Sequence, residues 1–137
     1  MNKEYNLQFE KLCDKLNLGK LTSEPEQIFG GHLNRVYALT TTTGKYAVKA
    51  LNPHVMLRPE AKQNHINAEH IAQIAAKVIP AAPAKIFVGD FLIEIDAQYY
   101  LVFDWLFGES LFHDEITMDH CRKMGSILAK LHSIDFS

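Results

Sequence analysis

The stretch QIFGGHLNRVYALTTTTGKYAVKAL, from Gln27 to Leu51, decides the expected fold. Val36, Ala38 and Thr40 alternate with Tyr37 and Leu39, the run Tyr46–Leu51 follows Gly44, and the pair Gly30–Gly31 precedes both runs. Alternation of period two that is interrupted by glycine is typical of antiparallel strands joined by tight turns. We therefore expect three strands, with a glycine turn between the first two and a two-residue turn at Thr43–Gly44 before the third.

One cation, Lys49, lies inside the apolar run of the third expected strand, Tyr46–Leu51. Lysine is costly to bury unless it has an acidic partner or an anionic ligand. The position therefore indicates either a binding role or an edge-strand lysine whose stem covers apolar surface while its ammonium reaches water. Taken alone, this residue leaves both interpretations open.

The chain of 137 residues has a formal net charge of -2, with 47% hydrophobic and 22% charged residues. These values fit one soluble globular domain and give no electrostatic reason to expect nucleic acid or a membrane as partner. No apolar run approaches the roughly 20 residues of a membrane-spanning helix, and the start of the chain, MNKEYNLQFEKL, lacks the apolar core of a signal peptide. We expect a cytoplasmic protein in which Cys13 and Cys121 are reduced thiols.

Two helices are expected on either side of these strands in the sequence. The first, within residues 4–17, is expected to end at Gly19 and to cover one face or edge of the sheet. The second, over residues 61–77, carries an apolar stripe that predicts its core contacts: Ile71, Ile74, Ala75 and Val78. Glu69 lies off that stripe, toward Ala72 and Ala76, so it is either a solvated surface residue or an acid that closely approaches another element.

Two more strands, Leu92–Ile95 and Tyr99–Phe103, are separated by a gap of hairpin size at 96–98. The expected fold is α+β: a five-stranded antiparallel sheet with a packed helix, an N-terminal helix and a C-terminal helical tail. Gly108 suggests a hinge. The tail helix is expected to begin after an N-cap at Thr117, with Asp119 in its first turn.

The tail helix carries an apolar stripe that nothing later in the sequence can cover: Met118, Cys121, Met124 or Gly125, Leu128 and Leu131. Phe107, Leu111 and Phe112 extend this apolar surface toward the expected hinge. Soluble monomers rarely expose a contiguous apolar patch of this kind. We therefore expect self-association through the tail helix, for example as a swapped dimer.

These parts follow one another in a specific order: a glycine turn between two strands, a lysine on the third strand, an acid on the following helix, and a hinge after the fifth strand. This order resembles the nucleotide-binding lobe of a protein-kinase-like enzyme. In detail it is similar to the aminoglycoside phosphotransferase and choline kinase-like family of small-molecule kinases. The resemblance covers about residues 25–135 and is carried by Gly30–Tyr37, Tyr46–Lys49, Glu69, Tyr100–Leu111 and Gly125–His132.

The resemblance implies a site for ATP or GTP with Mg²⁺. In such a site Lys49 contacts the α and β phosphates and pairs with Glu69, while the glycine turn brings backbone amides close to phosphate oxygens. The Asp104 carbonyl and the Leu106 amide would bond the purine edge. The ring would lie among Ile28, Val36, Ala47 and Phe103. The implied nucleotide-binding residues are Gly30, Gly31, Asn34, Val36, Ala47, Lys49, Glu69, Phe103, Asp104 and Leu106.

Several departures from the family pattern qualify this interpretation. The turn lacks a third glycine, and Gly44-Lys45 is not a Walker P-loop because Tyr46 replaces the required Ser or Thr. No HGD, HRD or DFG string occurs, so the sequence lacks the catalytic aspartate and the metal ligands that phosphoryl transfer needs. We expect residues 1–106 to form the kinase-like N-terminal lobe, and residues 107–137 to form the hinge, a linker and the first helix of a missing C-terminal lobe.

The predicted function is the ATP-binding lobe of a small-molecule kinase that acts on an alcohol group, truncated before its catalytic loop and inactive alone. The alternative is a catalytically dead module that senses a nucleotide or binds a protein. The acceptor alcohol is not identified by these residues.

Other constellations are weaker. His65, Glu69 and His70 offer two ligands on one helix face but no HExxH motif, which argues against zinc. Proximity in sequence does not make a triad of Ser133, His132 and Asp135. The aromatic cluster is either a ligand platform or strand core with a hinge wall, and it comprises Tyr99, Tyr100, Phe103, Trp105 and Phe107.

Overall fold

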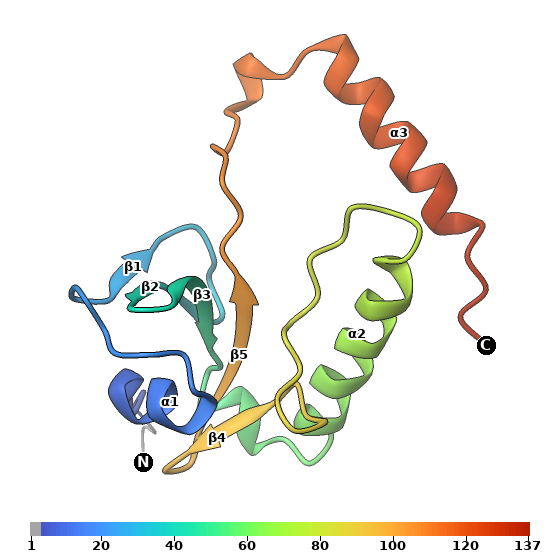
Figure 1. Cartoon of the computed structure of the whole chain (residues 1–137). Helices are drawn as coiled ribbons and strands as arrows, with labels where there is room; N and C mark the ends of the chain where they lie inside the picture. Colours follow the sequence, from blue (N-terminus) through green and yellow to red (C-terminus); the bar gives the residue numbers. More distant parts are fainter. Residues whose placement is uncertain (1–3) are drawn as a thin grey trace.

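The computed structural model describes residues 4–137 and confirms the α+β fold class. Five strands form one antiparallel sheet in the order β1-β2-β3-β5-β4 (Figure 1). The strands are β1 (Glu26–Ile28), β2 (Arg35–Thr41), β3 (Gly44–Ala50), β4 (Ile93–Ile95) and β5 (Gln98–Asp104). The helices are α1 (Phe9–Leu16), α2 (Ala61–Ala75) and α3 (Met118–His132), with short 3-10 turns at Val55–Leu57 and His113–Glu115.

Helix α1 covers one face of the sheet, as the sequence predicted. Alternate residues of β2, β3 and β5 point toward it and are buried, because successive side chains of a strand lie on opposite faces. The Phe9 ring lies 4.8 Å from the ring of Tyr37. The main core lies on this face and comprises Leu12, Cys13, Leu18, Tyr37, Leu39, Val48, Ala50, Ile93, Ile95, Tyr100 and Val102.

Helix α1 ends earlier than predicted. Its last residue is Leu16, and Asn17 caps it in the left-handed conformation, with φ of 57°. Asparagine tolerates this conformation, so no glycine is needed there. Gly19 has a different role: a Cβ on it would collide with the Thr42 hydroxyl, so this glycine allows the chain to pass close to the β2–β3 turn.

Helix α2 faces the opposite side of the sheet through part of the predicted stripe, since Ala75 is buried and Ile74 is half-buried, but the other two predicted residues are exposed. Ile71 and Val78 are each 51% exposed. The side that turns inward comprises Ala61, His65, Glu69, Ala72 and Ala75. The backbone amide of Ala84 donates to Glu69 Oε2 at 2.7 Å. Because small residues surround this carboxylate, the helix approaches the connector before β4 closely enough to bond its backbone.

The β2–β3 turn lies one residue before its predicted position, and the β4–β5 turn is one residue shorter than predicted. The β2–β3 turn is Thr42–Thr43, and Gly44 already pairs with Thr41. Thr43 Oγ1 donates to the Leu18 carbonyl at 2.6 Å, which favours threonine within the turn. The β4–β5 turn is Asp96–Ala97, with φ of 46° and 69°, so Gln98 belongs to β5 and pairs with Ile95.

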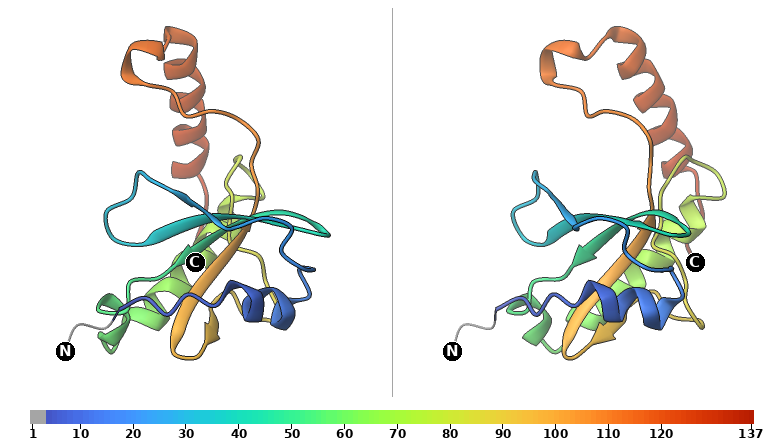
Figure 2. Two further views of the ribbon diagram at one scale, coloured as in Figure 1. Left: turned by 90° about the vertical axis from the view of Figure 1, so that its left-hand side faces the viewer. Right: turned by 60° about the vertical axis from the view of Figure 1, so that its left-hand side comes forward.

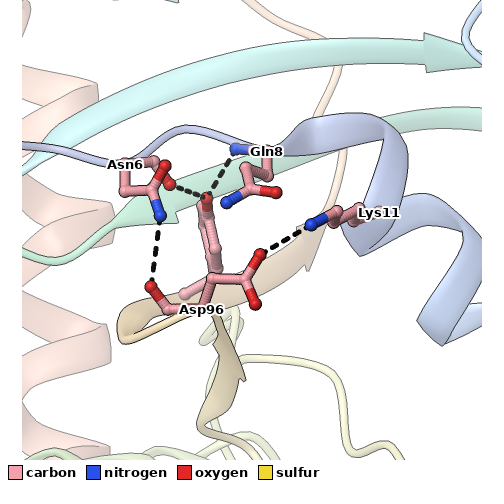
Figure 3. A network of polar contacts seen from close by, with 5 residues as sticks. Asn6, Gln8, Lys11 and Asp96 are labelled. Atoms are coloured by element: carbon pink, nitrogen blue, oxygen red, sulfur yellow. Dashed lines mark hydrogen bonds and ion pairs between the residues drawn. The ribbon is translucent and has the colours of Figure 1, made fainter.

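The segment before α1 is fastened to the β4–β5 hairpin (Figure 3). The buried Tyr100 hydroxyl accepts from the Gln8 amide and donates to the Asn6 carbonyl, both at 3.1 Å. Lys11 forms an ion pair of 2.7 Å with Asp96, whose carbonyl also accepts from the Asn6 side chain at 3.2 Å. The beginning of the described chain is thus bonded to one of its last strands.

An extended segment leads away from the sheet after β5, and helix α3 follows it and runs back toward α2 (Figures 1 and 2). The predicted N-cap is confirmed, since Thr117 Oγ1 accepts from the His120 amide at 3.3 Å. Asp119 lies in the first turn. Within residues 4–137, no helix is both long and apolar enough to cross a membrane.

Candidate functional site

Two cross-strand rows bring the predicted site residues to one face of the sheet. In the first row Ile28 pairs with Val36, Val36 with Lys49, and Lys49 with Leu101. In the second row Ala38 pairs with Ala47, and Ala47 with Phe103. Directly opposite residues of antiparallel strands lie on the same face. Val36, Ala47, Lys49 and Phe103 therefore share a face, which is the one opposite α1.

This face is half-open, whereas the other is closed. Tyr37, Val48 and Val102 point toward α1 and are buried. Their sequence neighbours Val36, Ala47 and Phe103 point the other way and are only partly covered. The apolar surface around Lys49 can therefore accept a flat apolar group with an anionic end next to it.

The predicted ion pair between Lys49 and Glu69 is not formed. Among residues 4–137, the ion pairs within 4.0 Å join Lys11 to Asp96, Lys85 to Asp104 and Lys123 to Asp119. Lys49 Nζ lies 5.4 Å from the centroid of the Phe103 ring. Glu69 instead accepts the amide of Ala84, a residue that is 1% exposed. A buried amide without a partner is costly, so the carboxylate has a structural use on the connector.

His65 links the two predicted partners electrostatically. Burial lowers the pKa of its imidazole, the Lys49 charge lowers it further, and the Glu69 charge opposes them. The lowered pKa keeps this histidine neutral at physiological pH.

The glycine loop joins β1 to β2 and has an exposed tip. Gly30 has a φ of 140°, which favours glycine, and the neighbouring Phe29 is 84% exposed. Asn34 lies at the rear of the loop, where its Oδ1 accepts from the Asn52 amide at 2.9 Å. A cavity of about 300 Å³ beside the loop is lined in part by Gly31 and Asn34.

The predicted hinge residues line a second cavity. The β3–β5 ladder ends at the pair of Tyr46 and Asp104. The Asp104 carboxylate pairs with Lys85 at 2.8 Å, and Leu106 beyond it is 69% exposed. Phe103, Asp104 and Leu106 line a cavity of about 420 Å³ together with residues 81–86 of the connector.

Sequence reasoning missed three residues that shape the site. The sequence pattern indicates His65 only as a possible metal ligand. Asn52 lies two residues after β3 and precedes a proline, which is a turn signal. Nothing in the sequence pattern pointed to Lys85, because its partner Asp104 belongs to a distant segment.

The described residues do not fit a magnesium cage built by protein. Within 4–137, no three His, Cys, Asp or Glu side chains are grouped so that they could hold a metal ion. The donor set that does fit a ligand is the Lys49 ammonium, the backbone of the glycine loop and the hinge backbone. These groups suit an anion attached to an apolar ring.

A family model matches most of the chain. The family model described as "Phosphotransferase enzyme family" matches residues 24–137. A search of curated proteins gave no match. Among solved structures, the kinase domain of PknI from Mycobacterium tuberculosis is similar, with 20% identity and a TM-score of 0.38. That likeness covers 64% of this chain and 32% of that one, so the chain spans about a third of the length of the kinase domain.

The environment of His65 predicts a pH dependence of stability. Because the pKa of His65 is lowered from 6.5 in the folded chain, the unfolded state binds more protons near that pH. Stability should therefore decrease as the pH falls from about 7.5 to about 5.5. Urea unfolding across this range should show a weaker pH dependence for His65→Gln than for the wild type. His54→Gln, at an exposed histidine, is the control, and equal slopes for His65→Gln and the wild type would contradict the assignment.

Proposed function

Because the chain belongs to the phosphotransferase enzyme family, we propose that residues 1–106 form the nucleotide-binding lobe of a small-molecule kinase. Residues 107–137 then form the hinge, a linker and the first helix of the second lobe. The enzyme transfers a phosphoryl group from ATP or GTP to an alcohol. This chain contributes the site that binds and orients the nucleotide.

One observation carries the proposal: Val36, Ala47, Lys49 and Phe103 are aligned on one half-open sheet face, between the glycine loop and the hinge. The purine lies against the three apolar side chains, and burying them contributes to affinity. The Lys49 ammonium then lies where the phosphates leave the ring. In the part of the chain that the structure describes, the Lys49 ammonium has no acidic partner within 4 Å. A phosphate bound beside it would therefore contribute strongly to the affinity for the nucleotide.

The two ends of this face supply backbone groups. Gly30 and Gly31 let the loop come close to phosphate oxygens and offer amides to them. Asn34 is the last residue of the loop before β2 and lines the cavity beside it. At the other end the ladder stops at Asp104, so the Asp104 carbonyl and the Leu106 amide can bond the purine edge. Mg²⁺ would neutralise phosphate charge when it is bound with the nucleotide.

Glu69 supports the site through the connector. Its carboxylate holds the Ala84 amide, and Ala84 lines the hinge cavity. Glu69 therefore belongs to the proposed site. Its negative charge also acts on His65, where it opposes the effect of the Lys49 charge on the pKa.

We also propose that the protein resides in the cytoplasm. Cys13 and Cys121 are both free cysteines, and Cys121 is exposed. Exposed thiols persist in a reducing compartment.

The nucleotide site can be tested by calorimetry with ATP and Mg²⁺. Lys49→Ala should weaken binding by about tenfold to a hundredfold, because a charge-assisted contact with phosphate is lost. Lys20→Ala removes an exposed lysine on the side of α1 and should leave the affinity unchanged. Equal binding by the wild type and Lys49→Ala, or no binding by either, would refute the site.

Phosphoryl transfer can be tested with the purified chain. Since the sequence has no HGD, HRD or DFG string, we expect nucleotide binding without turnover on any alcohol acceptor. A module that only senses a nucleotide shares this expectation, but it would bind tightly by itself. Measurable production of ADP that depends on an added alcohol would disprove the inactivity.

Self-association follows from the exposed apolar residues of the hinge and tail. Phe107 is 90% exposed, Phe112 74% and Met118 70%, and this surface continues along α3 through Met124 and Leu128. We propose that two copies cover it mutually. Light scattering should show dimers that Leu128→Glu weakens, with Lys130→Glu on the same helix as control. A monomer at high protein concentration would contradict this proposal.

A further inference from the structure

The first described residues lie outside the range that the family model matches, which begins at residue 24. They nevertheless reach the candidate site. Tyr5 donates its hydroxyl to the Leu33 carbonyl at 3.2 Å, and Leu33 belongs to the glycine loop. The Arg35 guanidinium lies 4.3 Å from the centroid of the Tyr5 ring, on the side of the sheet that α1 covers.

A second donor holds the same carbonyl. The Asn52 side chain donates to Leu33 O at 3.1 Å, and the Asn52 backbone amide donates to Asn34 Oδ1 at 2.9 Å. Asn52 directly follows Leu51, whose carbonyl accepts from the buried Gln98 side chain at 2.8 Å. Gln98 Oε1 in turn accepts from the Asn6 amide at 3.1 Å. The contacts therefore form a closed ring that runs from Tyr5 through Gln98 and Asn52 to Leu33 and back to Tyr5.

This ring fixes only the rear of the glycine loop. Phe29 and Gly30 at its tip are exposed, and nothing lies within 4 Å of a Cβ built on Gly30. The Leu33 carbonyl and the Asn34 amide belong to one planar trans peptide. Two donors on the carbonyl therefore direct the Asn34 N–H away from the N-terminal segment. That N–H lies outside the β1–β2 ladder, which ends at the pair of Ile28 and Val36.

We propose that Tyr5 is a positioning residue that, together with Asn52, holds the Leu33–Asn34 peptide so that the Asn34 amide binds a nucleotide phosphate. This inference rests on the proposed function, since it assigns a phosphate donor within that site. The N-terminal segment is then a rigid support for the loop. The exposed tip remains able to adapt to the ligand.

The support is tested first on the chain without ligand. Tyr5→Phe removes the hydroxyl but keeps the ring beneath Arg35. Tyr46→Phe is the matched control, because within residues 4–137 the hydroxyl that it removes bonds the Thr43 hydroxyl alone, at 3.0 Å. Amide hydrogen exchange at Asn52, whose amide donates to Asn34 Oδ1, and at Arg35 should become faster in Tyr5→Phe and stay unchanged in Tyr46→Phe. Unchanged exchange in Tyr5→Phe would overturn the support.

The link to phosphate is tested by comparing ATP with adenosine. Tyr5→Phe should weaken ATP binding by about threefold to tenfold, because one donor to the Leu33 carbonyl remains. Adenosine affinity should not change, since adenosine lacks phosphates, whereas a general loss of structure would weaken both ligands. Unchanged ATP affinity in Tyr5→Phe would overturn the inference. If the wild type binds neither ligand, the proposed function fails and the phosphate role falls with it, while hydrogen exchange still decides whether Tyr5 supports the loop.

Discussion

The register of β3 between β2 and β5 determines what the two faces of this sheet can do. Val48 lies opposite Tyr37 and Val102 in the core, whereas Lys49 lies opposite Val36 and Leu101 on the other face. A slip of one residue would exchange these two side chains and drive an ammonium into the core, at a cost of several kcal/mol or a change of protonation. The register that places Val48 in the core therefore also places the Lys49 ammonium on the half-open face.

Helix α2 contributes to the site through its position more than through a direct contact with Lys49. Its carboxylate at Glu69 bonds the connector at Ala84, so the helix, the connector and the hinge cavity are joined by one charge-assisted hydrogen bond. The charges of Lys49 and Glu69 act on His65 in opposite directions, and burial keeps this imidazole neutral. The acid that the family pattern assigns to the lysine thus has a structural role in this conformation.

Much of the fold was predictable because strands with one buried face show alternation that can be read locally. The strands, the Thr117 cap and the covering role of α1 follow from such local patterns. The buried side of α2 was predicted only in part: Ala75 is buried, but Ile71 and Val78 are exposed because the close approach to the connector selects small side chains. Contacts between distant segments, such as Lys85 with Asp104 or Tyr5 with Leu33, leave no periodic signal.

The hydroxyl of Tyr100 bonds backbone groups 92 and 94 positions earlier in the chain. During synthesis on a ribosome, the residues around Asn6 must therefore wait until β5 has been made before their final partners exist. Closing so long a stretch of chain delays the native contacts, which is the usual reason that topologies of high contact order fold slowly. Until then α1 and the first strands expose apolar surface, so the nascent chain depends on late closure to complete its core.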